Sequence, residues 1–374
     1  MHIHHIGMLR SWASWSKVMR QHLVELKRLG HSISSQNYKN DRYNPEFQLQ
    51  EPLDSISELP IDPNPIAITY LPPSEYRHID NKFPLVGFLV YEATRWPSEW
   101  VKQARNNLTH AIVPSKFNYN GLVESGFKRQ NITIVPYGFN KKLYYPNKGK
   151  NEEEILDILF VGTPVNRKGL DILLRSITNA FDPEDNIRVT LKINPYSGDI
   201  ASRPYVMPNW EQECLQLRNE GYNTRLIFRL LPETDLSTLY READVLCLPT
   251  RGEGFGLTLL EAMACGTPPL VTKWGGQLDF VNESNSFLLS NYNYITANND
   301  VLSDPPSSST DSKMVDPDET ELSNKLRHLY DNPAELQKIS ENTSKSVDHL
   351  TWEKTTQTLA ETLASCIAGH PEFN

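Results

Sequence analysis

The feature that most constrains the fold is an alternation of short apolar runs with helical patterns, clearest in the second half of the chain. The expected strands there are residues 155–162, 189–193, 225–230, 245–249 and 269–272, and the expected helices between them are 168–180, 210–220, 236–243 and 257–265. Strands that alternate with helices form a parallel sheet covered on both faces. Ligands bind such sheets at the carboxyl ends of the strands. We therefore expect an α/β fold with its site at that edge.

The first half repeats the pattern less clearly, with expected strands at 3–7, 65–70, 84–90, 111–115 and 132–136 and an expected helix at 12–29. Residues 37–64 and 304–313 are rich in polar residues and proline and predict irregular connections. A chain of 374 residues exceeds one typical core. The polar stretch 144–154 predicts a linker. We expect domains at 1–145 and 152–345, and a C-terminal helical segment, 346–374, that packs back on the first domain.

Composition narrows the class of protein. No stretch approaches the roughly 20 apolar residues that a membrane span needs, and the first residues lack the pattern of a secretory signal. The four cysteines, Cys214, Cys247, Cys265 and Cys366, have no paired spacing, which indicates reduced thiols in a cytoplasmic protein. The net charge of −9 disfavours general nucleic-acid binding.

The stretch "RGEGFGLTLLEAMACGTPPL" begins at Arg251, at the carboxyl end of an expected strand, and leads into an expected helix. Glycines let the backbone approach a ligand closely, and the first helical N–H groups, at Leu257 and Thr258, attract an anion. Helical side chains tilt toward the amino terminus, so Glu253 and Glu261 can line one pocket. Carboxylates accept hydrogen bonds from hydroxyls. The stretch therefore predicts a site for a ribose, a diphosphate and a sugar, with a helix-capping turn as the alternative.

Two common nucleotide motifs are absent here. Leu257 stands where the dinucleotide pattern G-x-G-x-x-G needs its third glycine, and the chain has no G-x-x-x-x-G-K-[ST] sequence.

The block "GEGFGLTLLEAMACGTPPLVT" resembles the E-x7-E motif of retaining glycosyltransferase family 4, whose members have the GT-B architecture. "LFVGTPVNRKGLDILLRSI", "ITIVPYGFN", "AIVPSKFNYNGLVESGF" and "DPDETELSNKLRHLYDNPAEL" resemble further segments of that family. The resemblance implies two facing Rossmann-like domains with parallel sheets and an interdomain cleft. It also implies that the second domain binds a nucleotide-diphospho-sugar donor and the first binds the acceptor.

By position in the motif, the resemblance gives Lys168 the diphosphate, Glu261 the ribose hydroxyls and Glu253 the hydroxyls of the transferred sugar. It assigns the rest of the donor site to Gly162, Thr163, Gly254, Phe255, Gly256, Leu257 and Thr258. It implies transfer with retention of anomeric configuration, through stabilisation of the leaving diphosphate and positioning of the acceptor. No metal or cofactor is expected to be required.

The chain departs from the family pattern at three places, one of which is Asn140, where the family usually has Asp. Thr163 stands where an arginine that binds the diphosphate is common. Arg167 either turns inward and restores that charge, acting with Lys168 and Glu253 in catalysis, or faces solvent. Glu92 lies where many members have a histidine. We expect it, with Gly7, on the acceptor side, and plain surface exposure is the alternative for Glu92.

Two other features have simple interpretations. Asp316-Pro-Asp318 has the form of a D-x-D metal motif but precedes a helical pattern, which favours helix capping. His2, His4 and His5 lack further ligands for a metal and are expected to face solvent from a strand.

The basic residues of helix 12–29, Lys17, Arg20, Lys27 and Arg28, indicate a solvated face, or contact with an anionic membrane that would suit a lipid-linked acceptor.

The sequence therefore predicts a cytoplasmic, metal-independent glycosyltransferase for a glycan, lipid-linked or small-molecule acceptor. Two alternatives remain open: a non-catalytic subunit that binds sugar nucleotides, and a two-domain sugar-nucleotide epimerase or hydrolase.

Overall fold

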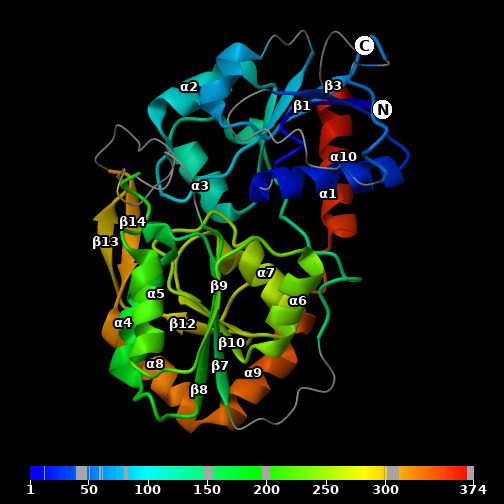
Figure 1. The fold of residues 1–374 in the computed structure, drawn as a ribbon. Helices are drawn as coiled ribbons and strands as arrows, with labels where there is room; N and C mark the ends of the chain where they lie inside the picture. The colour runs from blue at the N-terminus through cyan, green and yellow to red at the C-terminus, as the bar shows by residue number, and fades with distance from the viewer. Residues whose placement is uncertain are drawn as a thin grey trace. The chain divides into compact units, whose positions relative to one another are not determined.

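The computed structural model describes residues 1–11, 13–38, 49, 51–58, 60, 62–79, 83–146, 155–195, 203–298, 300 and 311–368. The chain folds as two compact units. The first comprises Met1–Tyr91, Arg95–Gly138 and Leu350–Asn374, and the second comprises Glu92–Thr94 and Phe139–His349. Each contains a six-stranded sheet whose strand pairs are all parallel (Figure 1). The predicted α/β class with Rossmann-like sheets is confirmed.

The sheet of the first unit has the strand order β2-β1-β3-β4-β5-β6. Its strands are β1 (His2–Gly7), β2 (Ser32–Asn37), β3 (Ile66–Thr69), β4 (Leu85–Phe88), β5 (His110–Val113) and β6 (Ile132–Ile134). Its helices are α1 (Ser14–Arg28), α2 (Ser98–Asn107), α3 (Lys116–Glu124) and α10 (Trp352–Ala368), with short 3-10 helices at Pro73–His78 and Arg129–Asn131.

The three histidines of β1 are buried, so the prediction that they face solvent is wrong. The exposed fractions of His2, His4 and His5 are 6%, 3% and 0%. β1 lies between β2 and β3, which leaves it no edge, and a serine of β2 contacts one nitrogen of each ring. Ser34 Oγ lies 2.8 Å from His2 Nε2 and from His4 Nδ1, and Ser35 Oγ lies 2.7 Å from His5 Nδ1. Burial lowers the pKa of His5 to about 3, so this ring is neutral.

The C-terminal helix α10 belongs to the first unit, where it packs against α1 (Figure 1). The fully buried ring of His22 in α1 lies 5.2 Å from the ring of Trp352, and Thr356 Oγ1 lies 3.4 Å from His22 Nδ1. Gly138 lies against the start of α10, where a Cβ would come within 2.3 Å of the Trp352 backbone nitrogen.

Two of the basic residues of α1 support neighbouring loops. Arg20 donates to the carbonyls of Leu9 and Ser11 at 2.6 and 2.7 Å, and Lys27 donates to the Pro52 carbonyl at 2.7 Å. Arg28, with an exposed side-chain fraction of 63%, fits the predicted solvated face better. Trp12 lies outside the described residues.

The sheet of the second unit has the order β12-β11-β10-β7-β8-β9. Its strands are β7 (Leu156–Gly162), β8 (Ile187–Ile193), β9 (Thr224–Ile227), β10 (Val245–Leu248), β11 (Pro269–Thr272) and β12 (Phe287–Leu289). The helices are α4 (Leu170–Ala180), α5 (Trp210–Asn219), α6 (Glu233–Glu242), α7 (Leu257–Ala264), α8 (Glu319–Asp331) and α9 (Pro333–Ser346), with 3-10 helices η3 (Asn166–Lys168) and Gly276–Asp279. Strands β13 (Tyr292–Thr296) and β14 (Lys313–Pro317) form a separate antiparallel pair.

The helices of the second unit form two groups. α4 contacts α5 and α8, whereas α7 contacts α6 and α9, and Figure 1 shows the groups on opposite sides of the sheet. The central strands are therefore covered on both faces, and Ile158, Leu159, Phe160 and Leu246 are fully buried. This burial explains why β10, and β7 after Asp157, are apolar in the sequence.

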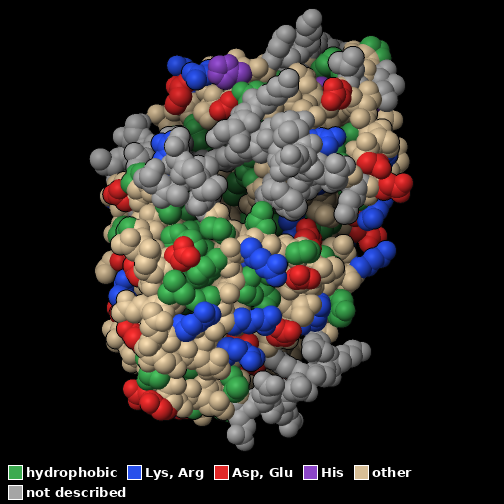
Figure 2. Space-filling model, viewed as in Figure 1, with side chains coloured by type: hydrophobic (Ala, Val, Ile, Leu, Met, Phe, Trp, Pro, Cys, Tyr) green, Lys and Arg blue, Asp and Glu red, His purple; other side chains and the backbone are tan. Residues whose placement is uncertain are grey.

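Surface charge and helix length were both considered in the sequence, for nucleic-acid binding and for membrane spans. Figure 2 shows basic and acidic side chains interspersed on the face in view, without a continuous field of one sign. None of the described helices is long and apolar enough to cross a membrane.

Candidate functional site

Two loops of the second unit meet at the carboxyl ends of the adjacent strands β7 and β10. The first runs from Gly162 and Thr163 into η3, and the second runs from Thr250 to Gly256 and into α7. Gly169 joins them closely, with a φ of +70° and with its Cβ position only 2.0 Å from the Pro249 carbonyl oxygen. Only glycine tolerates both conditions. The fold thereby brings the predicted Lys168 and Glu253 segments together.

The side chains of Lys168, Arg167 and Glu253 form one cluster. Lys168 Nζ lies 2.6 Å from Glu253 Oε2, and Arg167 Nη1 lies 3.4 Å from the same oxygen. Arg167 Nη1 also donates to the Gly252 carbonyl at 2.8 Å. The exposed fractions of the three side chains are between 12% and 15%. Burial alone would raise the pKa of Glu253, but the charges of Lys168 and Arg167 outweigh it and hold that pKa below its usual value.

Arg167 turns inward and does not face solvent. Its second amino group, Nη2, lies 3.1 Å from Glu92 Oε1, and the Glu92 side chain is 16% exposed. The backbone is equally close, because a Cβ on Gly252 would lie 2.4 Å from the Glu92 carbonyl oxygen. Glu92 is therefore a half-buried partner of Arg167. Its predicted contact with an acceptor stays a prediction.

The loop between β10 and α7 is shaped by glycines. Gly256, with a φ of +98°, is the N-cap of α7. The Glu253 carbonyl accepts a 2.7 Å hydrogen bond from the Gly276 N–H. Phe255 is 2% exposed, and its ring lies 5.1 Å from that of Phe280. Gly254 is also buried, whereas Leu257 and Thr258, at the start of the helix, are half-buried. The helix amino terminus at this edge attracts negative charge.

Glu261 has other neighbours than Glu253. It is 4% exposed and lies in α7 close to Tyr144 and Tyr240. Burial, followed by the negative charge of Glu261, raises the pKa of both phenols well above their usual value. The expectation that Glu253 and Glu261 line one pocket stays a prediction.

The sequence reasoning missed Arg251 and Asp171. Arg251 is 12% exposed, and its Nη2 lies 2.8 Å from Asp171 Oδ2. The sequence shows only that Arg251 directly precedes the Gly-Glu pair and that Asp171 stands three positions after Lys168. The two residues are 80 positions apart, so the sequence did not indicate that they form a pair.

The Asp316-Pro-Asp318 stretch has structural roles. Asp318 is the N-cap of α8, and its Oδ1 accepts the Glu321 N–H at 2.6 Å, so the capping interpretation is confirmed. Asp316 Oδ1 lies 2.7 Å from Arg251 Nε. Within the part of the chain that the structure describes, no group of three or more His, Cys, Asp or Glu side chains is arranged to hold a metal ion.

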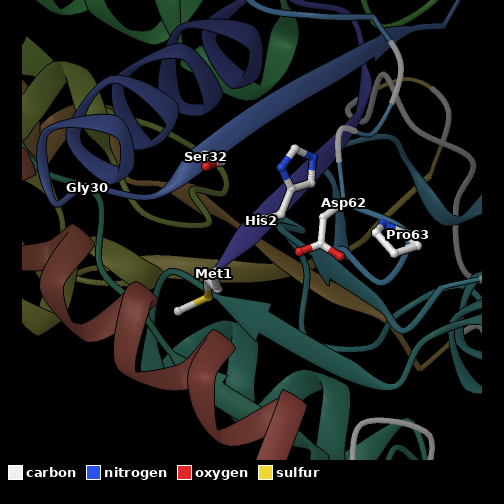
Figure 3. Close-up of a pocket in the computed structure, with 6 residues that line it drawn as sticks. All are labelled: Met1, His2, Gly30, Ser32, Asp62 and Pro63. Atoms are coloured by element: carbon white, nitrogen blue, oxygen red, sulfur yellow. The ribbon is translucent and has the colours of Figure 1, made fainter.

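Two features of the first unit lie at opposite ends of β1. Gly7 ends the strand, where a Cβ would lie 2.5 Å from His5 Nε2, and its carbonyl accepts the Tyr38 N–H at 2.8 Å. At the amino end, a pocket is lined by Met1, His2, Gly30, Ser32, Asp62 and Pro63 (Figure 3). Ligands of parallel sheets bind at carboxyl ends, so the Figure 3 pocket is at the wrong edge for the predicted site.

The second unit matches a known family model. Residues 156–303 match Glycosyl transferases group 1. This group 1 region contains both site loops, with Lys168, Arg167, Glu253 and Glu261. Mannosylfructose-phosphate synthase of Agrobacterium fabrum is 28% identical to the chain over 160 residues, which is 40% of this chain and 34% of that protein. D-inositol 3-phosphate glycosyltransferase of Corynebacterium jeikeium is 34% identical over 171 residues, 42% of this chain and 39% of that protein. The matches thus span well under half of these relatives.

Solved structures resemble the whole chain. HepE of Anabaena, in complex with UDP and glucose, has a TM-score of 0.70 at 13% identity, covering 98% of this chain and 100% of that one. Sucrose-phosphate synthase of Thermosynechococcus elongatus has a TM-score of 0.71 at 18% identity, covering 99% of this chain and 100% of that one. The chain has the fold of these GT-B glycosyltransferases, with the group 1 region in its second unit.

Proposed function

We propose that the chain transfers a sugar from a nucleotide-diphospho-sugar to an acceptor hydroxyl, with retention of anomeric configuration and without a metal. The observation that carries this proposal is the cluster of Lys168 and Arg167 on Glu253, at the carboxyl ends of β7 and β10. Two cations beside a helix amino terminus suit a diphosphate, and a carboxylate next to them suits sugar hydroxyls. The match of residues 156–303 to the group 1 model supports the same activity.

In the proposed complex the diphosphate takes hydrogen bonds from Lys168 and Arg167. The N–H groups of these cations that now contact Glu253 turn to the phosphate oxygens, and the freed Glu253 carboxylate accepts hydrogen bonds from the sugar. Gly162, Thr163 and the backbone of Gly254, Phe255, Gly256, Leu257 and Thr258 line the donor. Glu261 holds the ribose hydroxyls.

The chemical step exchanges one bond to the anomeric carbon for another. The bond from that carbon to the β-phosphate oxygen breaks, and the acceptor oxygen attacks from the same face. The acceptor proton moves to the leaving phosphate oxygen. Negative charge develops on the diphosphate, where one preorganised donor such as Lys168 is worth about 3–4 kcal/mol.

The donor nucleotide and the acceptor are proposed from the similar structures and from the activity. HepE of Anabaena was solved with UDP and with UDP-glucose, which supports uridine diphosphate as the first donor nucleotide to examine. A glycan or lipid-linked acceptor fits the activity, and α1 is the element we propose for peripheral membrane contact in the second case. We place Gly7 and Glu92 on the acceptor side.

Release of nucleoside diphosphate from a panel of sugar nucleotides, followed by proton NMR of the product, tests the proposal. We expect release from at least one donor and a product with the donor's anomeric configuration. An inverted product would contradict retention, and release from none of the donors would contradict transfer.

A further inference from the structure

Arg251 lies where three segments of the second unit meet. Its guanidinium donates to the Asn166 carbonyl at 2.5 Å and pairs with Asp316 at 2.7 Å. Its backbone N–H donates to the Arg167 carbonyl at 2.7 Å, and its own carbonyl accepts the Val315 N–H at 3.0 Å. One residue therefore joins η3, the loop before α7 and strand β14.

The pairing of Arg251 with Asp171 fixes the orientation of the guanidinium. Nη1 lies 2.8 Å from Asp171 Oδ1, and Nη2 lies 2.8 Å from Oδ2. Two parallel hydrogen bonds define both distance and angle, which the single ammonium of a lysine cannot do. Burial would raise the pKa of Asp171, but its bonds and charge interaction with Arg251 hold that pKa below its usual value.

The contacts of Arg251 bracket Lys168 in the chain. Asn166 and Arg167 precede it, and Asp171 follows it on the first turn of α4. A single 3-10 turn such as η3 has poor internal hydrogen bonding and needs support from its surroundings. That support comes from Arg251, which lies two positions before Glu253 in the chain. The Glu253 carboxylate in turn pairs with Arg167 and Lys168 of the turn.

We infer that Arg251 is a positioning residue, which holds the turn containing Arg167 and Lys168 at the distance from Glu253 that donor binding needs. The consequence for the donor rests on the proposed function. The holding of the turn rests on the contacts alone.

The experiment compares Arg251→Lys with Arg175→Ala. Arg175 also pairs with Asp171, at 3.3 Å, but its side chain is 53% exposed and it makes no contact with the turn among the described bonds. Each variant is measured by hydrogen exchange of peptides that cover residues 163–171, by calorimetric titration with uridine diphosphate and by donor turnover.

We expect Arg251→Lys to speed exchange at residues 166–169 and to weaken nucleotide binding about tenfold or more, the cost of one charged hydrogen bond. We expect Arg175→Ala to match the wild type in both. Asp171→Asn, which keeps the shape of the partner, should behave like Arg251→Lys, and it decides the matter if the arginine variants do not fold.

Two results overturn the inference. One is a folded Arg251→Lys or Asp171→Asn protein with wild-type exchange at residues 166–169. The other is faster exchange together with wild-type nucleotide affinity and turnover, which would leave Arg251 a purely structural role. If the wild type binds no nucleotide, the proposed function fails and the exchange data alone decide whether Arg251 holds the turn.

Discussion

The Lys168 ammonium lies 2.6 Å from the Glu253 carboxylate, across two loops that leave neighbouring strands. The pair is joined by Arg167, whose guanidinium lies 3.4 Å from the same carboxylate oxygen. A diphosphate bound as proposed would compete with Glu253 for both cations. On the proposed function, we expect the cations and the carboxylate to have separable roles, with Lys168 and Arg167 acting on the nucleotide and Glu253 on the sugar.

Glu253→Gln should lower kcat while leaving nucleoside diphosphate affinity unchanged or higher. The amide keeps the shape but loses the charge-assisted bonds to the sugar, worth about 1.5–3 kcal/mol, or about ten- to a hundredfold in rate. It also releases Lys168 and Arg167 for the phosphates. Calorimetry with the nucleotide alone and with a full donor separates these effects. An equal loss of affinity for both ligands would contradict the sugar role.

Arg167→Ala and Lys168→Ala should each lower kcat by about a hundredfold or more, because each removes a donor from the leaving diphosphate. The side chains share one carboxylate oxygen, so the double variant should be non-additive. A double-mutant cycle measures this, by comparing the turnover of the wild type, the two single variants and the double variant. A nearly wild-type Arg167→Ala beside an inactive Lys168→Ala would restrict the diphosphate site to the lysine.

Gly169→Ala should destabilise the second unit far more than Gly266→Ala. Both glycines have positive φ, +70° and +86°, so each substitution costs about 1–2 kcal/mol in backbone strain. Only at Gly169 does the new Cβ meet backbone, 2.0 Å from the Pro249 carbonyl oxygen, which adds about 1–3 kcal/mol of overpacking. Urea unfolding of the two variants measures the difference. Equal losses would mean that the loops are not packed as described.

Lys192→Met should remove a pH dependence of stability. Lys192 is 2% exposed, its described partner is the neutral Asn194 Oδ1, and burial lowers its pKa from 10.5 to about 8. Between these values the unfolded chain binds a proton that the folded chain does not, so wild-type stability gains with rising pH over that window. We expect the difference in unfolding free energy between variant and wild type to shrink from pH 8 to 10.5. A constant difference would show that Lys192 titrates normally.

Much of the second unit could be predicted because its strands and helices have clear patterns of apolar residues within short stretches of the sequence. β10 is an apolar run, and so is β7 after Asp157. The rule that ligands bind at carboxyl ends pointed to Glu253, and the resemblance to the glycosyltransferase family pointed to Lys168. β2 was not predicted, since Ser32–Asn37 is mostly polar and its buried serines contact histidines of β1 about 30 positions away in the sequence.

Contacts between distant residues had no signature in the sequence. The Arg251–Asp171 pair joins side chains 80 positions apart, and either residue alone looks like a surface charge. The β13–β14 pair was missed because the expected irregular stretch 304–313 lies between its strands. Most of that stretch lies outside the described residues.

The central claim is that Lys168 and its neighbours bind the diphosphate of a sugar nucleotide, and a thermal-shift titration with nucleoside diphosphates and their sugars tests it most directly. A ligand that binds only the folded state stabilises it by about 2.7 kcal/mol at a hundredfold excess over Kd, and this stabilisation raises Tm. We predict that at least one nucleotide raises the Tm of the wild type and fails to do so for Lys168→Ala. An equal rise in both proteins, or no rise with any nucleotide, would contradict the account.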